Sequence, residues 1–165
     1  MALRNIVVEG DEVLRKRCKE VPEVNDRIRQ ILDDMVETMR DAEGVGLAAP
    51  QVGILRRMFV VETEEDGLFY VVNPEIIEVS GEKNEAEGCL SLPGMIGEVV
   101  RPTYVKMKAL DRDGNPVEYE ARDFLAKAFC HEFDHLEGIL FKDKATNYQE
   151  IGDDEEYDEE WEDEE

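Results

Sequence analysis

Two stretches of the chain repeat their apolar residues with the period of an α-helix. In the first stretch, which lies between Asn25 and Gly44, the repeat forms one stripe, as is typical of a helix packed on a core. Asn25 or Asp26 can cap the start of this helix, and Gly44 can end it. In the second, residues 122–137, apolar residues fill two neighbouring arcs, so we expect a helix buried over most of its surface. The first stripe consists of Ile28, Ile31, Leu32, Met35, Val36 and Met39.

Between these helices the pattern is typical of β-strands. Two apolar runs flank the sequence Glu64-Glu65-Asp66-Gly67 and predict a hairpin, and apolar residues alternate with lysines within 104–110, as in a half-buried strand. We assign no strand to the polar stretch 81–87, and we expect a short helix over 11–18 with Asp11 near its start. The predicted strands are 57–63, 68–73, 76–80, 99–110 and 116–121.

Composition divides the chain into a folded part and a tail. We predict one catalytic domain over residues 1–150 and an acidic, disordered tail over 151–165, because residues 153–165 hold 11 acids and no base. The net charge is −23, and the rest of the chain is also acidic. That balance argues against direct nucleic-acid binding, which needs a basic surface. The tail is either a solubilising segment or a binding site for a basic partner.

The cysteine count and the N-terminal sequence predict a cytoplasmic protein. The chain has three cysteines, Cys18, Cys89 and Cys130, and this small, odd number argues against a disulfide framework. The N-terminus has no apolar core of signal-peptide length, and no apolar run approaches the length of a membrane span. We therefore expect a soluble protein in a reducing compartment, with no membrane contact.

The sequence H-E-x-x-H at residues 131–135 indicates a metal site. His131 and His135 are the only histidines of the chain, and a spacing of four places both on one face of a helix. Their imidazoles can converge on one ion, with Glu132 at the edge of that face. This ligand pair suits Zn²⁺ or another first-row divalent ion.

A catalytic metal site needs a third protein ligand and an open position, and several residues compete for that role. One protease pattern would continue with a histidine where this chain has Phe141. A downstream carboxylate such as Glu150 is a second option, and Cys89, a potential thiolate in a tight segment, is the strongest. Cys89 could equally be an ordinary core residue. Cys130 adjoins His131 but points about 100° away on a helix.

Three motifs, taken together, resemble those of peptide deformylases. GVGLAAPQ at 44–51, EGCLS at 87–91 and HEFDH at 131–135 occur in that order in a chain of this size, and the similarity extends from about residue 5 to 144. The resemblance implies an α+β fold, with antiparallel strands packed around a central helix that carries the H-E-x-x-H motif. It also implies a metal-dependent hydrolase that removes the N-formyl group from the N-terminal methionine of newly synthesised proteins.

The resemblance also implies a role for individual residues. The family uses Fe²⁺ in the cell, and Zn²⁺, Ni²⁺ or Co²⁺ in preparations, whereas ligand softness alone would favour Zn²⁺. A metal-bound hydroxide would attack the formyl carbon, releasing formate. By matching motif positions, Cys89, His131 and His135 would bind the metal, Glu132 would be the general base and acid, and Gln51 with the backbone N–H of Leu90 would bind the oxyanion.

The implied substrate is a formyl-methionyl nascent peptide, met in the bacterial cytoplasm with transient ribosome contact. Gly46 would let the peptide lie against the backbone by strand addition. The methionine pocket should be apolar, and Val45, Phe124 and Ala128 are the candidates.

The chain departs from the family in two places. Cys130 stands where the family usually has glutamine, which adds an oxidisable thiol near the site. An acidic tail replaces the terminal helix with which many members dock on the ribosome, which argues against that mode of contact.

Two other hypotheses compete with a deformylase. A zinc endopeptidase with the same H-E-x-x-H would give no role to Cys89. A non-enzymatic, metal-stabilised module would need a closed site with four protein ligands, and only three good ligands are visible in the sequence.

Overall fold

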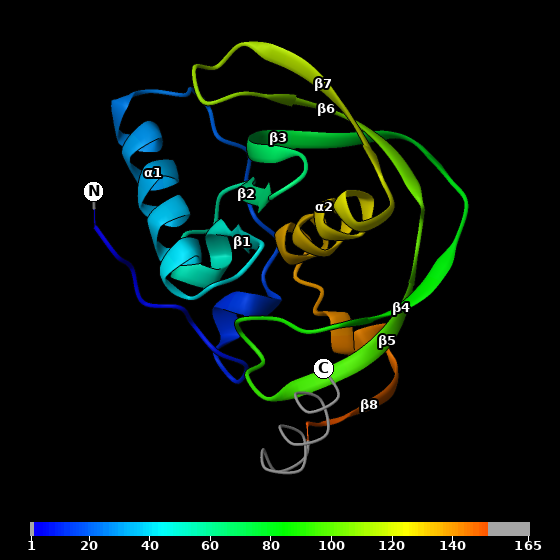
Figure 1. Cartoon of the computed structure of the whole chain (residues 1–165). Coiled ribbons are helices and arrows are strands. Elements are labelled where there is room, and N and C mark those ends of the chain that lie inside the picture. The colour runs from blue at the N-terminus through cyan, green and yellow to red at the C-terminus, as the bar shows by residue number, and fades with distance from the viewer. Residues whose placement is uncertain (1, 152–165) are drawn as a thin grey trace.

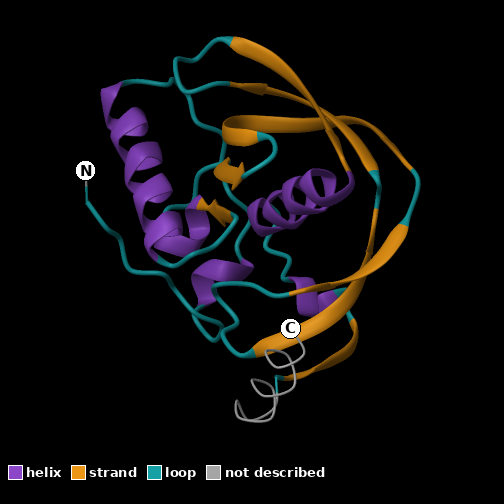
Figure 2. Cartoon of the chain, viewed as in Figure 1, coloured by secondary structure: helices purple, strands orange, loops and turns teal. Residues whose placement is uncertain are grey.

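The computed structural model describes residues 2–151, and its elements form an α+β fold with antiparallel strands, as predicted (Figures 1 and 2). Of the predicted tail, residues 152–165 lie outside the described part of the chain. No helix within the described part has the length and apolarity needed to cross a membrane. The helices are α1 (Asp26–Asp41) and α2 (Asp123–Leu136); the strands are β1 (Gly46–Ala48), β2 (Met58–Thr63), β3 (Gly67–Ser80), β4 (Lys83–Glu87), β5 (Met95–Arg101), β6 (Tyr104–Leu110), β7 (Pro116–Arg122) and β8 (Thr146–Glu150); short 3-10 turns lie at Glu12–Arg15, Ala49–Val52 and Phe141–Asp143.

The larger sheet has five antiparallel strands in the order β1-β2-β3-β6-β7. β2 is buried on both faces: Phe59 and Val61 join the core that includes α2, whereas Met58 and Val60 join the core that includes α1. Two-sided burial explains why this strand reads as a continuous apolar run rather than an alternating one. β3, β6 and β7 curve around α2, which lies on the concave side of the sheet (Figure 1).

α1 packs its apolar stripe on the side of the sheet away from α2, as the periodicity predicts. The side chain of Asn25 accepts a hydrogen bond from the backbone N–H of Ile28 at 3.0 Å and so caps the helix. The backbone N–H of Gly44 donates to the carbonyl of Met39 just beyond the last turn. The first helix and its N-terminal cap were therefore predicted correctly, whereas the left-handed residue after its C-terminus is Glu43, with φ of 60°, and not Gly44.

The smaller sheet, in the order β4-β5-β8, was mostly missed. We predicted one strand over 99–110, but the structure divides it into β5 and β6, which belong to different sheets. Pro102 lies at the break, where its missing N–H cannot contribute to a ladder. β4 and β8 were not predicted because both are rich in exposed polar residues and show no apolar alternation.

β3 is one strand of 14 residues, where two separate strands were predicted. The predicted break covers residues 74–75 and directly follows Asn73, which has φ of 52°. Its side chain accepts from the N–H of Val21 at 2.8 Å and donates to the carbonyl of Val21 at 2.9 Å. Asparagine tolerates positive φ better than most residues, so the strand continues through an irregularity in its pairing with β6.

Candidate metal centre and active site

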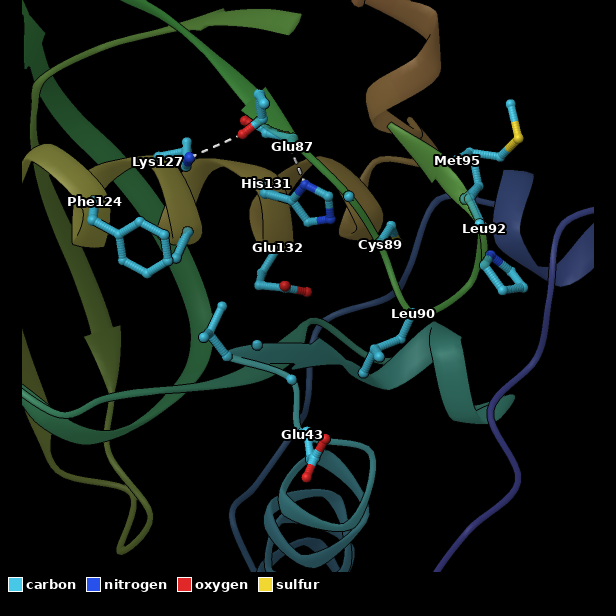
Figure 3. Close-up of a pocket in the computed structure, with 18 residues that line it drawn as sticks. Glu43, Glu87, Cys89, Leu90, Leu92, Met95, Phe124, Lys127, His131 and Glu132 are labelled. Atoms are coloured by element: carbon cyan, nitrogen blue, oxygen red, sulfur yellow. Dashed lines mark hydrogen bonds and ion pairs between the residues drawn. The ribbon is translucent and has the colours of Figure 1, made fainter. Parts of the chain in front are cut away.

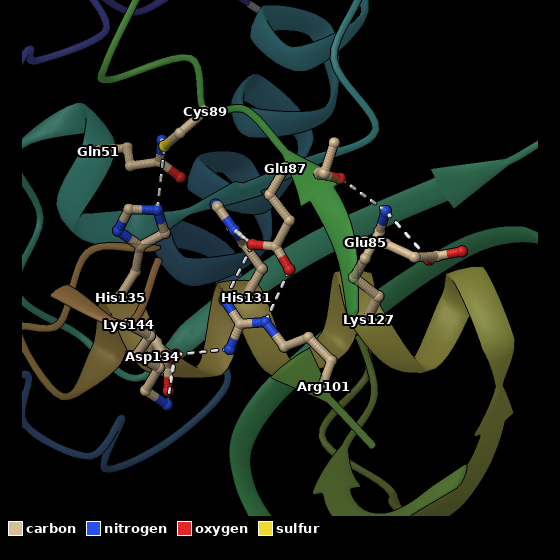
Figure 4. A network of polar contacts seen from close by, with 11 residues as sticks. Gln51, Glu85, Glu87, Cys89, Arg101, Lys127, His131, Asp134, His135 and Lys144 are labelled. Atoms are coloured by element: carbon tan, nitrogen blue, oxygen red, sulfur yellow. Dashed lines mark hydrogen bonds and ion pairs between the residues drawn. The ribbon is translucent and has the colours of Figure 1, made fainter. Parts of the chain in front are cut away.

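Cys89, His131 and His135 meet at one point of the structure (Figure 4). Their ligand atoms all lie within 4.8 Å of one another, and Sγ of Cys89 is 3.4 Å from Nε2 of His135. The two histidines come from consecutive turns of α2, and the cysteine comes from the loop after β4. The structure thus brings Cys89 to the histidines, whereas Glu150 lies in β8 and is not part of this group.

The donor set fits a single divalent ion. One thiolate and two imidazoles suit first-row metals, and three protein ligands leave a position open. Nδ1 of His131 is 2.8 Å from Oε1 of the Glu87 carboxylate, which leaves Nε2 of this ring for a metal. A carboxylate on the distal ring nitrogen is the usual partner of a metal-binding histidine, because it fixes the ring orientation and raises ligand basicity.

A buried ionic network supports His131 from below (Figure 4). Arg101 donates two hydrogen bonds to Glu87, at 2.7 and 3.0 Å, and a third to Asp134 at 2.7 Å. Lys144 lies 3.0 Å from the same Asp134 oxygen. Burial opposes ionisation of Glu87, but the hydrogen bonds from His131 and Arg101 hold its pKa at about 2. Glu87 is therefore a carboxylate at neutral pH.

Glu132 lies at the floor of the cleft below His131 (Figure 3). Its Oε1 is buried and has no hydrogen-bond partner within the described part of the chain. Burial raises the pKa of Glu132 to about 7, which is the range for exchanging a proton near neutral pH. Gly46 of β1 lies so close to the Glu132 carboxylate that a Cβ at this position would overlap it.

Gln51, from the turn Ala49–Val52, and Leu90, next to Cys89 in the loop after β4, flank the metal ligands. Nε2 of Gln51 lies 3.6 Å from Sγ of Cys89, so the amide faces the ligand group. Leu90 follows Cys89 directly, and within residues 2–151 its backbone N–H meets no protein acceptor. Both donors predicted from the sequence therefore lie beside the candidate metal centre.

A cavity of about 520 Å³ opens next to this group (Figure 3). Gly46, Phe124 and Ala128 line it together with Val45. Val45 and Phe124 are also exposed to solvent, which places them at its mouth. The ammonium of Lys127 lies 3.5 Å from a carboxylate oxygen of Glu85 and 3.1 Å from the carbonyl of Ala86. The predicted pocket residues thus form one cavity with Glu132 and His131.

Two residues of α2, Cys130 and Asp134, lie outside the two apolar arcs predicted for this helix, yet both are buried. Asp134 is buried because Arg101 and Lys144 pair with it. Cys130 belongs to the apolar core, where burial raises the pKa of its thiol to about 11, and it is not a member of the ligand group.

Three residues at the site had no predicted role. Glu87 and Ser91 stand at the two ends of the EGCLS motif, so the motif itself could have pointed to them. Arg101 lies at the end of a strand without any motif, and no sequence signal marks its burial.

The comparisons with known proteins agree on one family. A family model described as polypeptide deformylase matches residues 3–150. The peptide deformylase of Clostridium botulinum (strain Alaska E43 / Type E3) is 53% identical over 146 residues, which cover 88% of this chain and 99% of that protein. The crystal structure of the Ehrlichia chaffeensis peptide deformylase in complex with actinonin matches with a TM-score of 0.86 and 34% identity over 99% of both chains. The Thermotoga maritima peptide deformylase structure matches with a TM-score of 0.85 and 42% identity over 87% of this chain and 98% of that one. The resemblance found from the three motifs is confirmed, and this chain belongs to the peptide deformylase family of enzymes.

Proposed function

We propose that this enzyme removes the formyl group from the N-terminal methionine of newly synthesised proteins and releases formate. The observation that carries the proposal is the convergence of Cys89, His131 and His135 beside the buried carboxylate of Glu132. In this proposal residues 1–150 are the catalytic domain with α2 as its central element, and residues 151–165 are a separate acidic tail. The setting is the bacterial cytoplasm, with transient contact to the ribosome.

One divalent ion would be held by Cys89, His131 and His135. Fe²⁺ is the expected ion in the cell, with Zn²⁺, Ni²⁺ or Co²⁺ in preparations. When bound, the ion would supply Lewis acidity, lowering the pKa of a coordinated water and polarising the formyl oxygen. Glu87 would keep His131 in the ligand tautomer through the 2.8 Å contact at Nδ1.

Glu132 would act as the proton carrier. Its Oε1 has no hydrogen-bond partner among the described residues, so this atom can take a proton from the attacking water. The same carboxyl group can then deliver the proton to the amine that leaves when the C–N bond of the formamide breaks. A pKa raised to about 7 by burial suits both steps near neutral pH.

Gln51 and Leu90 would stabilise the negative charge that develops on the formyl oxygen. The Gln51 amide faces the ligand group, and the Leu90 N–H lies in the segment next to Cys89. Two neutral donors aimed at a developing oxyanion accelerate acyl-group hydrolysis most where water is excluded.

The peptide would add to the free edge of β1. β1 is an edge strand of the five-stranded sheet, and Gly46 has no side chain to obstruct an extended chain. The methionine side chain would enter the cavity between Val45, Phe124 and Ala128. Its largely apolar lining matches a thioether side chain.

The test is formate release from a formyl-methionyl peptide by protein loaded anaerobically with Fe²⁺. We expect turnover by the native enzyme, none by Glu132→Ala, and native rates for the control Glu64→Ala, which changes an exposed glutamate in the β2–β3 turn. Metal content is measured in all three. Absence of formate release by the fully loaded native protein would overturn the proposal.

The same preparation separates the deformylase from an endopeptidase. We expect no internal cleavage of an unfolded protein substrate, and we expect Cys89→Ser to lower metal content. If internal peptide bonds were cleaved and Cys89→Ser kept its metal, the endopeptidase hypothesis would replace this one.

A further inference from the structure

Ser91 is a fully buried residue that the proposed mechanism does not use. Its side chain has 0% exposure, and its Oγ accepts a hydrogen bond from Nε2 of Gln51 at 3.0 Å. A buried amide needs partners for both its nitrogen and its oxygen, since an unpaired polar group in the interior is costly. Ser91 therefore occupies one of the two hydrogens of the Gln51 amide.

The opposite end of the same amide is held by the backbone. The N–H of Ala48 donates to Oε1 of Gln51 at 2.9 Å. A rotation of the amide by 180° would set its NH₂ group against the Ala48 N–H, donor against donor. The two contacts thus permit one orientation, in which the second hydrogen on Nε2 is directed to the side of Cys89, at 3.6 Å from Sγ.

The backbones of these two residues are also tied to one another through the N-terminal segment. The N–H of Val7 donates to the carbonyl of Gln51 at 2.7 Å, and the N–H of Glu9 donates to the carbonyl of Ser91 at 2.8 Å. One short segment therefore spans two parts of the chain that are 40 residues apart in sequence. Ser91 cannot drift away from Gln51 without breaking this frame.

We propose that Ser91 is a positioning residue for the oxyanion donor: its hydroxyl holds the Gln51 amide so that the second N–H, on the side of Cys89, points at the reacting oxygen. This inference rests on the role given to Gln51 in the proposed function. Ser91 itself touches neither the metal ligands nor the substrate cavity in this scheme. Its effect should pass entirely through Gln51.

A double-mutant cycle tests this dependence. We expect Ser91→Ala to lower kcat about ten-fold, as for the loss of one neutral hydrogen bond, with KM changed by less than about two-fold. We expect Gln51→Ala to lower kcat about 100-fold or more, as for the loss of an oxyanion donor. The double variant should match Gln51→Ala alone, because Ser91 has nothing left to position.

The control is Thr38→Val, which removes another buried hydroxyl, on α1 and outside the site. Its effect on kcat should be small and should multiply with that of Gln51→Ala. Metal content and thermal midpoint are measured for every variant, and neither should separate Ser91→Ala from the native protein by more than Thr38→Val does. If Ser91→Ala fails to fold, Ser91→Cys replaces it, since a thiol fills the space but accepts hydrogen bonds weakly.

Three outcomes have different meanings. If the losses of Ser91→Ala and Gln51→Ala multiply in the double variant, Ser91 acts independently and the inference is wrong. If Gln51→Ala keeps full kcat, Gln51 is not an oxyanion donor, and the inference fails with that role while deformylation stands. If the native enzyme releases no formate, the proposed function itself fails.

Discussion

Replacing Arg101 with methionine should be among the most destabilising single changes outside the apolar core. The side chain of Arg101 is 4% exposed, and its guanidinium is bonded to Asp134 and to the carboxylate of Glu87, whose side chain is 3% exposed. Methionine keeps much of the volume of the arginine side chain, so the loss of stability comes from buried carboxylates left without their partner and not from a cavity. Breaking a buried ion pair by removing one partner costs about 3–5 kcal/mol, because the other charge remains buried.

The two carboxylates would not suffer equally. Asp134 would keep Lys144 at 3.0 Å, whereas Glu87 would keep only Nδ1 of His131. Most of the cost should therefore come from Glu87, and Arg101→Met/Glu87→Gln should recover part of it because glutamine carries no charge. For a domain of this size, about 3–5 kcal/mol corresponds to a fall of roughly 6–20 °C in Tm.

The assay is urea denaturation followed by circular dichroism, with a chelator present so that metal binding does not add to the stability. The control is Arg112→Met. Arg112 also makes two hydrogen bonds to one carboxylate, that of Asp33, at 2.9 and 2.7 Å, but the side chains are 37% and 21% exposed. A solvated pair of this kind contributes at most about 1 kcal/mol. Equal losses for the two arginine variants would refute the reasoning, because burial would then make no difference.

Three further outcomes follow from particular contacts. Gly46→Ala should lower kcat about 100-fold with the fold intact, because the added Cβ displaces the Glu132 carboxylate; steady-state kinetics and circular dichroism test this. Cys18 and Cys130 should resist maleimide at neutral pH in the folded enzyme, because both are buried and burial raises the pKa of each thiol to about 11; mass spectrometry should count at most one adduct per chain. Asn25→Ala should cost about 1 kcal/mol in urea denaturation through loss of the α1 cap.

The elements that were predicted correctly are those whose burial leaves a pattern in the sequence. The apolar stripe of α1 shows which face of that helix is buried, and the continuous apolar run of β2 shows that both of its faces are buried. β4 and β8 have no such apolar pattern, because most of their residues are polar and exposed. These two strands extend the smaller sheet on either side of β5. The single strand predicted over 99–110 failed because it ran across Pro102, where the chain passes from the smaller sheet to the larger one.

The candidate site divides in the same way. The histidine spacing could be recognised because a helix converts it directly into proximity. Cys89 could be singled out only as one option, because loop geometry, which spacing does not encode, decides whether a residue some forty positions upstream reaches the helix. The burial of Arg101 could not be predicted from the sequence, because a charged residue at a strand end is usually solvated. Arg101 is buried only because two buried carboxylates, those of Glu87 and Asp134, pair with it.

The buried charges below α2 follow from what a metal-binding histidine requires. A carboxylate on Nδ1 of His131 fixes the ring, but a lone carboxylate at that depth would be too costly to keep ionised. Arg101 offsets the charge of Glu87, Asp134 offsets that of Arg101, and Lys144 offsets that of Asp134 from a partly exposed position. This series of alternating charges ends at Lys144, whose ammonium can be solvated by water. The requirement for one oriented imidazole therefore accounts for four charged residues, three of them buried, and it explains why Asp134 of α2 lies in the interior.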